Sequence, residues 1–428
     1  MNKPQEPDQA ARRAAEQTAR QSYGKLLAFL AARTRDLAAA EDALAEAFAA
    51  ALASWPAQGI PRSPEAWLLS VARRRMIDAM RRRQTGDAAI DQLLLQAEEN
   101  QVRDTASGGI PDDRLRLMFV CAHPAIDPAA RAALMLQTVL GLDAGSIASA
   151  FLVAPASMAQ RLVRAKRKIR LAGIPFRVPE PDELPDRLEA VLDAIYAVFA
   201  EGWSDPAGAD VQSRGLIEEA IWLGRLLASL LPAEPEALGL LALMLHAEAR
   251  HAARRDAAGG YVPLLEQPPE RWDGPMVEEA EALLHRAGAL GRVGRYQLEA
   301  AVQSVHSARR HTGRTNWTAI VDLYDALLAR TGSAVVAINR AVALAERDGP
   351  AAGLAALAAI DGLPQLAQYQ PYWAARAALL ARDRQIEAAD KAYERAIGME
   401  RDPAVRQFLM QRRTRLKQPA PLRAADNP

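Results

Sequence analysis

Apolar residues recur at helical spacing through almost the whole chain, and this pattern most constrains the fold. Segments such as YGKLLAFLAARTRD and LAAAEDALAEAFAAALASW carry an apolar residue every few positions, and Pro and Gly separate one segment from the next. We find no sustained alternation of β-branched and aromatic residues bounded by turn residues, the pattern that would indicate strands. Aromatic residues make up only 5% of the chain and alanine dominates the apolar share, so helices can pack closely through small side chains. The sequence therefore predicts an all-α protein.

Charge, cysteine content and hydropathy narrow the class of protein. The chain has 428 residues and a formal net charge of +1, so its length predicts two to four domains and its charge has to be considered segment by segment. No apolar run reaches the length of a membrane span, and the N-terminal stretch MNKPQEPDQAARRAAEQ lacks an apolar centre. We therefore expect neither a membrane partner nor a signal peptide. The single cysteine, Cys121, excludes an internal disulfide and fits a cytoplasmic location.

Shifts in composition divide the chain into six segments. We expect a helical domain at 1–85, a polar linker at 86–112, a second helical domain at 113–173, a helical extension at 174–290, helical repeats at 291–415 and a disordered tail at 416–428. The repeats are predicted from weak self-similarity with a period of about 34 residues, as in tetratricopeptide (TPR) units. The residues that carry the pattern are Trp373, Ala377, Leu380, Ala389, Tyr393 and Ala396, preceded by Ala337, Ala341, Leu344, Gly353 and Leu357. This spacing predicts helix pairs that stack and share a core with their neighbours.

The second helical domain ends in a helix-turn-helix pattern. Asp143 is placed to cap a short helix, residues 152–154 make a tight connection, and Pro155 opens a longer helix. Between residues 156 and 173 this longer helix has six basic residues and no acidic one. Its apolar residues fall in one narrow sector, which predicts a buried stripe of Met158, Leu162, Ala165 and Ile169.

The polar residues of the same helix fall in another sector. They are Ser157, Gln160, Arg161, Arg164, Arg167 and Lys168. Flat bidentate donors suit base edges and cations suit phosphates, so this face predicts DNA binding, with the first four residues near bases and the last two near phosphates. A basic face that is merely solvated is the alternative.

The first helical domain contains a second basic helix, SPEAWLLSVARRRMIDAMRRR. Ser63, Pro64 and Glu65 form a good helix start, and Arg73, Arg74 and Arg81 share one side of the helix. Upstream lies an acidic group, Glu41, Asp42 and Glu46, with no basic residue between Arg35 and Arg62. A positively charged partner would explain this group, and so would solubility.

Taken together, these segments resemble an RNA polymerase sigma factor of the extracytoplasmic-function (ECF) group. AEDALAEAFAAAL is similar to the part of region 2 that docks on the β′ coiled coil, SPEAWLLSVARRRMIDAMRRR to the part that engages the −10 element, and the helix-turn-helix to region 4, which reads the −35 element. Further segments, among them LGLLALMLHAEAR, EQPPERWD and VAINRAVALAERDGPAAGL, resemble the subgroup with a long TPR-like C-terminal extension.

The resemblance implies a transcription initiation factor that binds core RNA polymerase, at the β′ coiled coil and β flap, and promoter DNA. Glu41, Asp42 and Glu46 would contact the polymerase. Trp67, Arg73, Arg74 and Arg81 would contact the −10 element, with the loop 56–64 holding a flipped base, and Ser157, Gln160, Arg161, Arg164, Arg167 and Lys168 would contact the −35 element. The extension would bind a protein or another part of the same chain.

Other classes of function remain open. A helix-turn-helix repressor or activator would bind DNA without polymerase, and a TPR scaffold would bind proteins with the basic helix incidental. We expect no enzyme, cofactor or metal, because six histidines and one cysteine give no metal-ligand spacing, and no phosphate-binding loop, dinucleotide fingerprint or nucleophile elbow is present.

Overall fold

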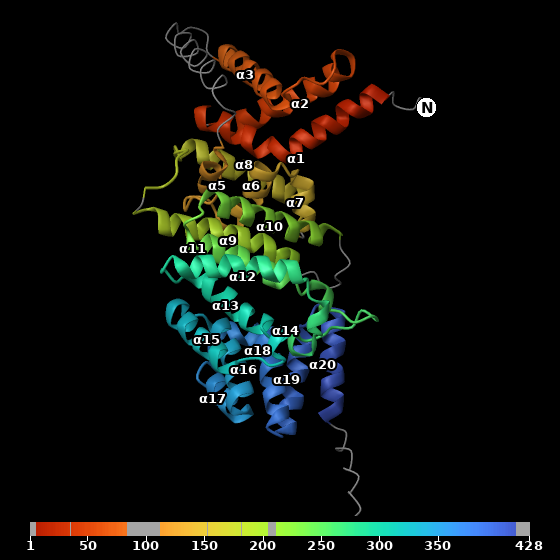
Figure 1. Cartoon of the computed structure of the whole chain (residues 1–428), viewed down its shortest axis with the longest axis vertical. Coiled ribbons are helices and arrows are strands. Elements are labelled where there is room, and N and C mark those ends of the chain that lie inside the picture. The colour runs from red at the N-terminus through yellow and green to blue at the C-terminus, as the bar shows by residue number, and fades with distance from the viewer. Residues whose placement is uncertain are drawn as a thin grey trace, which may run out of the picture. The chain divides into compact units, whose positions relative to one another are not determined.

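The computed structural model describes residues 6–34, 36–83, 112–151, 153–180, 182–203 and 211–416. The predicted linker, apart from Asp112, and the predicted tail, apart from Leu416, lie outside these ranges. The chain divides into two compact units, Met1–Glu201 and Gly202–Pro428. In the described residues the secondary structure is helical, with one isolated antiparallel bridge between Arg255 and Tyr261 (Figure 1). The prediction of an all-α fold is confirmed.

The first unit is built from eight described helices. They are α1 (Glu6–Thr34), α2 (Leu37–Gln58), α3 (Pro64–Arg83), α5 (Arg114–Cys121), α6 (Pro128–Leu140), α7 (Ala144–Ala150), α8 (Pro155–Leu171) and α9 (Leu184–Trp203), the last of which crosses into the second unit. Local chemistry fixes their ends: Asp36 caps α2 by accepting from the amide of Ala39, and α3 begins at Pro64 as predicted. The unit continues past residue 173, and the predicted boundary there stays a prediction.

Helix α1 crosses α6 in backbone contact. A Cβ atom added at Gly24 would lie 2.0 Å from the carbonyl oxygen of Val139, so a larger residue does not fit at this crossing. Gly141 ends α6 at a φ of 76°, and a Cβ there would lie 2.8 Å from the Tyr23 ring. Two glycines, one on each helix, therefore permit this close packing.

The second unit continues the helical pattern. Its helices are α10 (Val211–Leu230), α11 (Pro235–Glu248), α12 (Gly274–Ala289), α13 (Arg295–Ser307), α14 (Arg309–Thr312), α15 (Trp317–Thr331), α16 (Ala334–Asp348), α17 (Pro350–Ala358), α18 (Gln370–Arg382), α19 (Ile386–Met399) and α20 (Pro403–Leu416). Four short 3₁₀ turns lie between them, at His251–Ala253, Leu264–Glu266, Pro269–Arg271 and Pro364–Gln368.

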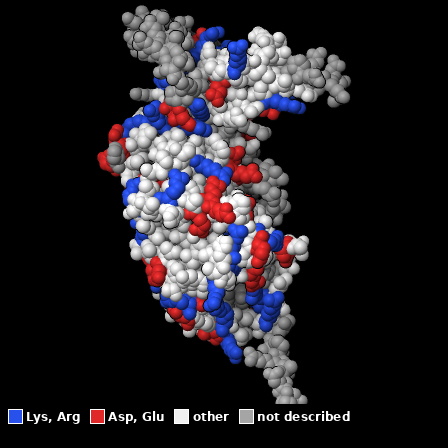
Figure 2. All heavy atoms as spheres, in the orientation of Figure 1, with Lys and Arg blue, Asp and Glu red and all other residues white. Residues whose placement is uncertain are grey.

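Opposite charges tie neighbouring helices of the second unit together. On the face shown in Figure 2, its basic and acidic side chains are interspersed rather than gathered into a patch of one sign. Arg382 on α18 pairs with Glu346 on α16, and Arg413 on α20 pairs with Asp390 on α19 at 2.7 Å. Much of the charge in this unit is therefore neutralised locally, which leaves no large field of one sign on the face shown.

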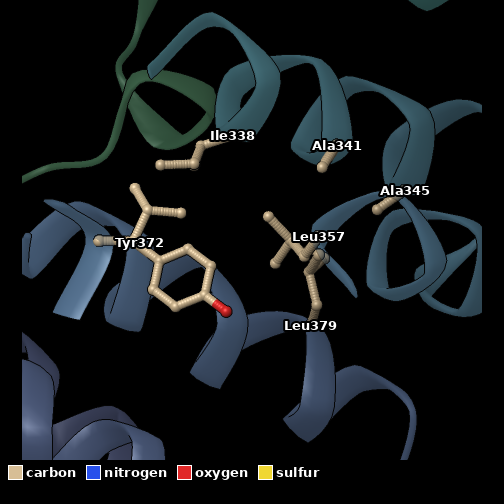
Figure 3. Close-up of a cluster of buried hydrophobic side chains, with 7 residues drawn as sticks. Ile338, Ala341, Ala345, Leu357, Tyr372 and Leu379 are labelled. Carbon is tan, nitrogen blue, oxygen red and sulfur yellow. The ribbon is translucent and has the colours of Figure 1, made fainter. Parts of the chain in front are cut away.

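Small residues let α16 and α17 pack closely. A Cβ at Gly353 would lie 2.6 Å from the Cβ of Ala345 and 2.7 Å from the carbonyl oxygen of Ala341. Next to this crossing lies a buried apolar cluster, which contains Leu357 from α17 and Tyr372 and Leu379 from α18 (Figure 3). The hydroxyl of Tyr372 leaves the cluster and donates to Asp361 at 2.8 Å, so its polar end is satisfied.

The next helix pair, α18 and α19, repeats this arrangement. The small residues Ala377 and Ala389 are both fully buried, twelve positions apart as Ala341 and Gly353 are. They belong to one apolar cluster that also contains Leu380, Tyr393 and Ala396. Most of the residues that carried the repeat pattern in the sequence thus lie at the contact between the helices of a pair, and their assignment to TPR units stays a prediction.

Candidate nucleic-acid interface

Helices α7 and α8 are formed by local signals in the sequence. The carboxylate of Asp143 accepts from the amides of Gly145 and Ser146, at 2.8 and 3.0 Å, and so caps α7 as predicted. Pro155 occupies the first turn of α8, where a missing amide hydrogen costs nothing. The buried residues of α8 are Met158, Leu162, Ala165 and Ile169, which confirms the predicted stripe.

The side of α8 opposite this stripe is exposed and basic. Ser157, Gln160, Arg164, Arg167 and Lys168 are all exposed, and the helix has no acidic residue. At about 100° per residue, Gln160 and Arg167 lie at the centre of this face, with Arg164 beside them. The face therefore presents one amide and two guanidinium groups to the solvent, the donor set that can bind base edges and phosphates together.

Two residues of α8, Arg161 and Val163, have an exposure that the sequence analysis did not predict. Arg161 is half-buried, and its guanidinium donates to the carbonyl oxygen of Ala129 at 3.3 Å, so it points toward the start of α6. Val163 is 64% exposed at one edge of this face, beside Gln160 and Arg167. The sequence already carried the signal for Val163, since it is an apolar residue outside the buried stripe.

Helix α3 carries the predicted −10 residues on more than one side. Trp67 is half-buried and meets the buried Trp55 edge to face, with ring centroids 5.5 Å apart. Arg74 is exposed, whereas Arg73 is half-buried with its guanidinium 4.8 Å from the centre of the Phe29 ring. The side chain of Arg81 lies outside the described residues.

The connection between α2 and α3 leaves an apolar side chain exposed. Gly59 ends α2 with a φ of 86°, and its amide donates to the carbonyl of Trp55 at 3.0 Å. The next residue, Ile60, is 45% exposed, and Arg62 is exposed. The connection thus exposes an apolar side chain and a cation a few residues before Trp67 in the chain, residue types that suit contact with an unstacked base.

The three acids predicted to contact polymerase have different surroundings. Asp42 is exposed, and Glu46 is exposed with a carboxylate oxygen 3.4 Å from Arg75. Glu41 is half-buried and forms an ion pair with Lys166 on α8. Burial raises the pKa of the Glu41 carboxyl, and the charge of Lys166 opposes that rise. The Lys166 contact could not have been predicted, because 125 positions separate the two residues.

Within the described residues we looked for a cluster of metal ligands and for an accessible thiol. No group of three or more His, Cys, Asp or Glu side chains in them could hold a metal ion. Cys121 is buried, with its sulfur 3.1 Å from the Thr138 hydroxyl, and burial raises the pKa of its thiol to about 12. Over the same part of the chain, none of the helices combines the length and apolar character needed to cross a membrane.

Known proteins match two segments of the chain and most of its length. Residues 19–85 match the sigma-70 region 2 family, and residues 187–288 match a family of unknown function, DUF6596. An uncharacterized protein of Rhizobium meliloti (strain 1021) is 41% identical over 384 residues, which is 89% of each chain. No solved structure matches.

The region 2 match spans most of α1 and all of α2 and α3, the helices that carry the acidic group, the Trp67 surface and the first basic helix. The DUF6596 match begins within α9 and ends within α12. The chain therefore has a sigma-70 region 2 domain near its N-terminus, which is the domain of a sigma factor, and it belongs to the same family as the Rhizobium meliloti protein.

Proposed function

We propose that this protein is a transcription initiation factor of the ECF kind, which binds core RNA polymerase and directs it to promoters through −10 and −35 elements. The observation that carries the proposal is the sigma-70 region 2 domain at residues 19–85. The exposed basic face of α8 supports it, because a sigma factor that reads two elements needs a second DNA-binding surface.

Region 2 would engage the −10 element at the junction of α2 and α3. Trp67 offers a flat surface and the exposed Ile60 an apolar one for an unstacked base, and Arg74 offers a cation for the backbone. Arg73 adds positive potential from its place over the Phe29 ring. Arg81, whose side chain lies outside the described residues, would contact the same element by the resemblance alone.

Helix α8 would read the −35 element in the major groove. Gln160, Arg164 and Arg167 are the exposed donors for base edges, and Val163, beside Gln160 and Arg167, is placed for the methyl group of a thymine. Ser157 and Lys168 flank this set and suit phosphates. Arg161 would position α8 through its hydrogen bond to the carbonyl oxygen of Ala129 and would not contact a base edge.

The polymerase would be bound through both parts of the first unit. Asp42 and Glu46 on α2 are exposed acids for a basic surface such as the β′ coiled coil, and Glu41, which pairs with Lys166, lies beside Asp42 on the same helix. The domain containing α5 to α8 would meet the β flap.

The second unit would regulate this activity as a TPR-like interaction module. The helix pairs α16–α17 and α18–α19 support the idea, since their small buried residues recur at the same spacing within each pair. Such arrays bind extended protein segments, either from a partner protein or from the same chain.

In vitro transcription with purified core polymerase and a pool of genomic fragments tests the proposal. We expect new, discrete start sites with the wild-type chain and their loss with Arg164→Ala. Arg177→Ala is the matched control, because Arg177 is a surface arginine of the same unit outside α8, paired with Glu180 and Glu183. Start sites that persist with Arg164→Ala would refute the role of α8, and no new start sites together with no binding to core polymerase would refute the sigma function.

A further inference from the structure

Two arginines that follow α11 lack the acidic partner that most half-buried arginines of the second unit have. Arg250 donates to the carbonyl oxygen of His246 at 3.1 Å and to the side-chain oxygen of Gln303 at 2.6 Å. Arg254 donates to the carbonyl oxygen of Trp203 at 3.3 Å and lies 4.2 Å from the centre of its ring. Both arginines are half-buried, and among the described residues neither forms an ion pair. A half-buried cation without a counter-charge is costly in free energy, so an anionic ligand would stabilise this pair.

Two acidic side chains act on Arg254 through space, and both have other partners. Burial lowers the pKa of Arg254, and the charges of Asp402 and Glu248 oppose that fall only in part. Asp402 pairs with Arg255 at 2.5 Å, and Glu248 lies 3.3 Å from His251. The positive charge of Arg254 is therefore not neutralised by a direct contact.

Two tyrosine hydroxyls complete the group. Tyr261 and Tyr324, the latter on α15, both lie close enough to Arg250 to act on its pKa. Burial and the charges of Arg254 and Arg309 lower this pKa to about 10, so Arg250 stays a cation at neutral pH. Neither hydroxyl makes a hydrogen bond within the described chain, and neither is among its buried atoms that lack a partner. Both hydroxyls therefore face solvent, and the same holds for Nη1 of Arg250 and Nη2 of Arg254.

The four groups are all hydrogen-bond donors toward the solvent, which limits the class of ligand. Burial raises the pKa of Tyr324 to about 12 and raises that of Tyr261 too, so both phenols keep their protons at neutral pH. Two guanidinium groups balance the charge of a phosphate monoester, about −1.5 to −2 at pH 7, and its three terminal oxygens can accept from all four groups. A carboxylate has one charge and two oxygens, so it would leave part of this set unused.

Space for a ligand adjoins the group. Tyr261 lines a cavity of about 190 Å³ between the loop 255–266 and α20, and its ring meets that of Phe408 edge to face, with centroids 5.5 Å apart. The two acids of the cavity wall are engaged, since Asp256 accepts from amides of its own turn and Glu266 accepts from Arg412. The cavity therefore has room for the part of a ligand that carries the phosphate.

We propose that Arg250, Arg254, Tyr261 and Tyr324 form a binding site for the phosphate group of a ligand in the second unit. Arg250 follows α11 and Tyr324 lies on α15, so a bound phosphate would connect these two parts of the unit. The site goes beyond the proposed sigma function and does not depend on it, because its ligand binds without polymerase or DNA.

Isothermal titration calorimetry of the full-length chain with inorganic phosphate, at constant ionic strength, tests the site. We expect saturable binding and a Kd about tenfold higher with Arg254→Gln, since a charge-assisted hydrogen bond is lost. Arg395→Gln is the matched control, because Arg395 also donates to a carbonyl oxygen, that of Ala367 at 3.0 Å, and lies 4.1 Å from the centre of a tryptophan ring. No saturable binding by the folded wild-type chain overturns the proposal, and so does a Kd that Arg254→Gln leaves unchanged.

Removal of the hydroxyls gives a second measurement that does not disturb packing. Tyr261→Phe and Tyr324→Phe keep the rings and delete hydroxyls that make no hydrogen bond within the described chain. We expect each to raise the Kd for phosphate about fivefold, whereas Tyr369→Phe, at a half-buried tyrosine of the same unit outside the group, should not change it. If Arg254→Gln does not fold, these variants still decide, and an unchanged Kd in both overturns the site.

Titration with phenyl phosphate and with acetate identifies the kind of ligand. Tighter binding of phenyl phosphate than of inorganic phosphate indicates a phosphorylated molecule, and the reverse order indicates the free ion; both support the site. Tighter binding of acetate than of either phosphate overturns the assignment to phosphate.

Discussion

Val163 gives the sharpest test of how α8 would read DNA. It is an apolar, β-branched residue, 64% exposed beside the hydrogen-bonding residues Gln160 and Arg167. We expect its side chain to contact the methyl group of a thymine in the −35 element. Replacing that thymine with deoxyuridine removes only the methyl group and leaves every hydrogen-bonding group of the base pair in place.

The expected magnitude follows from the area that the contact can bury. Complete burial of a valine side chain contributes about 1.5 kcal/mol, so covering the exposed 64% of Val163 contributes up to about 1 kcal/mol. One methyl group contributes about 0.8 kcal/mol. Loss of the thymine methyl should therefore raise Kd by up to about fourfold.

The assay is fluorescence anisotropy with duplexes in which each thymine of the selected −35 element is replaced in turn by deoxyuridine. We expect one position at which the wild-type chain loses affinity and at which Val163→Ala binds both duplexes equally. Val178→Ala is the control, because Val178 is an exposed valine of the same unit that lies beyond the end of α8.

A double-mutant cycle decides whether the two groups touch. If Val163→Ala distinguishes thymine from deoxyuridine as well as the wild-type chain does, the coupling between the side chain and the methyl group is zero. That result would refute the assignment of Val163 while leaving the roles of Gln160 and Arg164 to be tested separately.

Three further predictions concern stability and reactivity. Gly353→Ala should destabilise the chain by about 1–3 kcal/mol, because the added Cβ would lie within 2.7 Å of atoms of α16. Gly398→Ala in α19 is the control, since its Cβ would meet nothing within 4 Å, and it should be neutral or stabilising by up to about 1 kcal/mol. Equal melting temperatures of the two variants would contradict this prediction. Cys121 should resist iodoacetamide at pH 8 in the native chain and react after unfolding, since burial raises its pKa to about 12; rapid native labelling would contradict the packing. Burial lowers the pKa of His246 to about 4, so the unfolded chain takes up the proton first and stability should fall as the pH drops from about 6.5 toward 4. His246→Gln should weaken that dependence in denaturant titrations, while the same change at the exposed His285 should leave it unaltered.

The parts of the fold that the sequence predicted are those set by short-range chemistry. The stripe Met158, Leu162, Ala165 and Ile169 depends only on the helical repeat, and Asp143 caps a helix that starts one residue later. Both signals lie within a few turns of chain, so no knowledge of distant segments is needed.

Residues at the edge of an apolar sector could not be placed in the same way. Arg73 and Arg161 each lie beside a buried stripe, and the helical periodicity of the sequence assigned both to a polar face. The burial of each side chain depends on the residue that packs against that edge, which is Phe29 of α1 for Arg73 and Ala129 of α6 for Arg161. A long arginine stem covers apolar surface at such a position, so its charge does not decide its exposure.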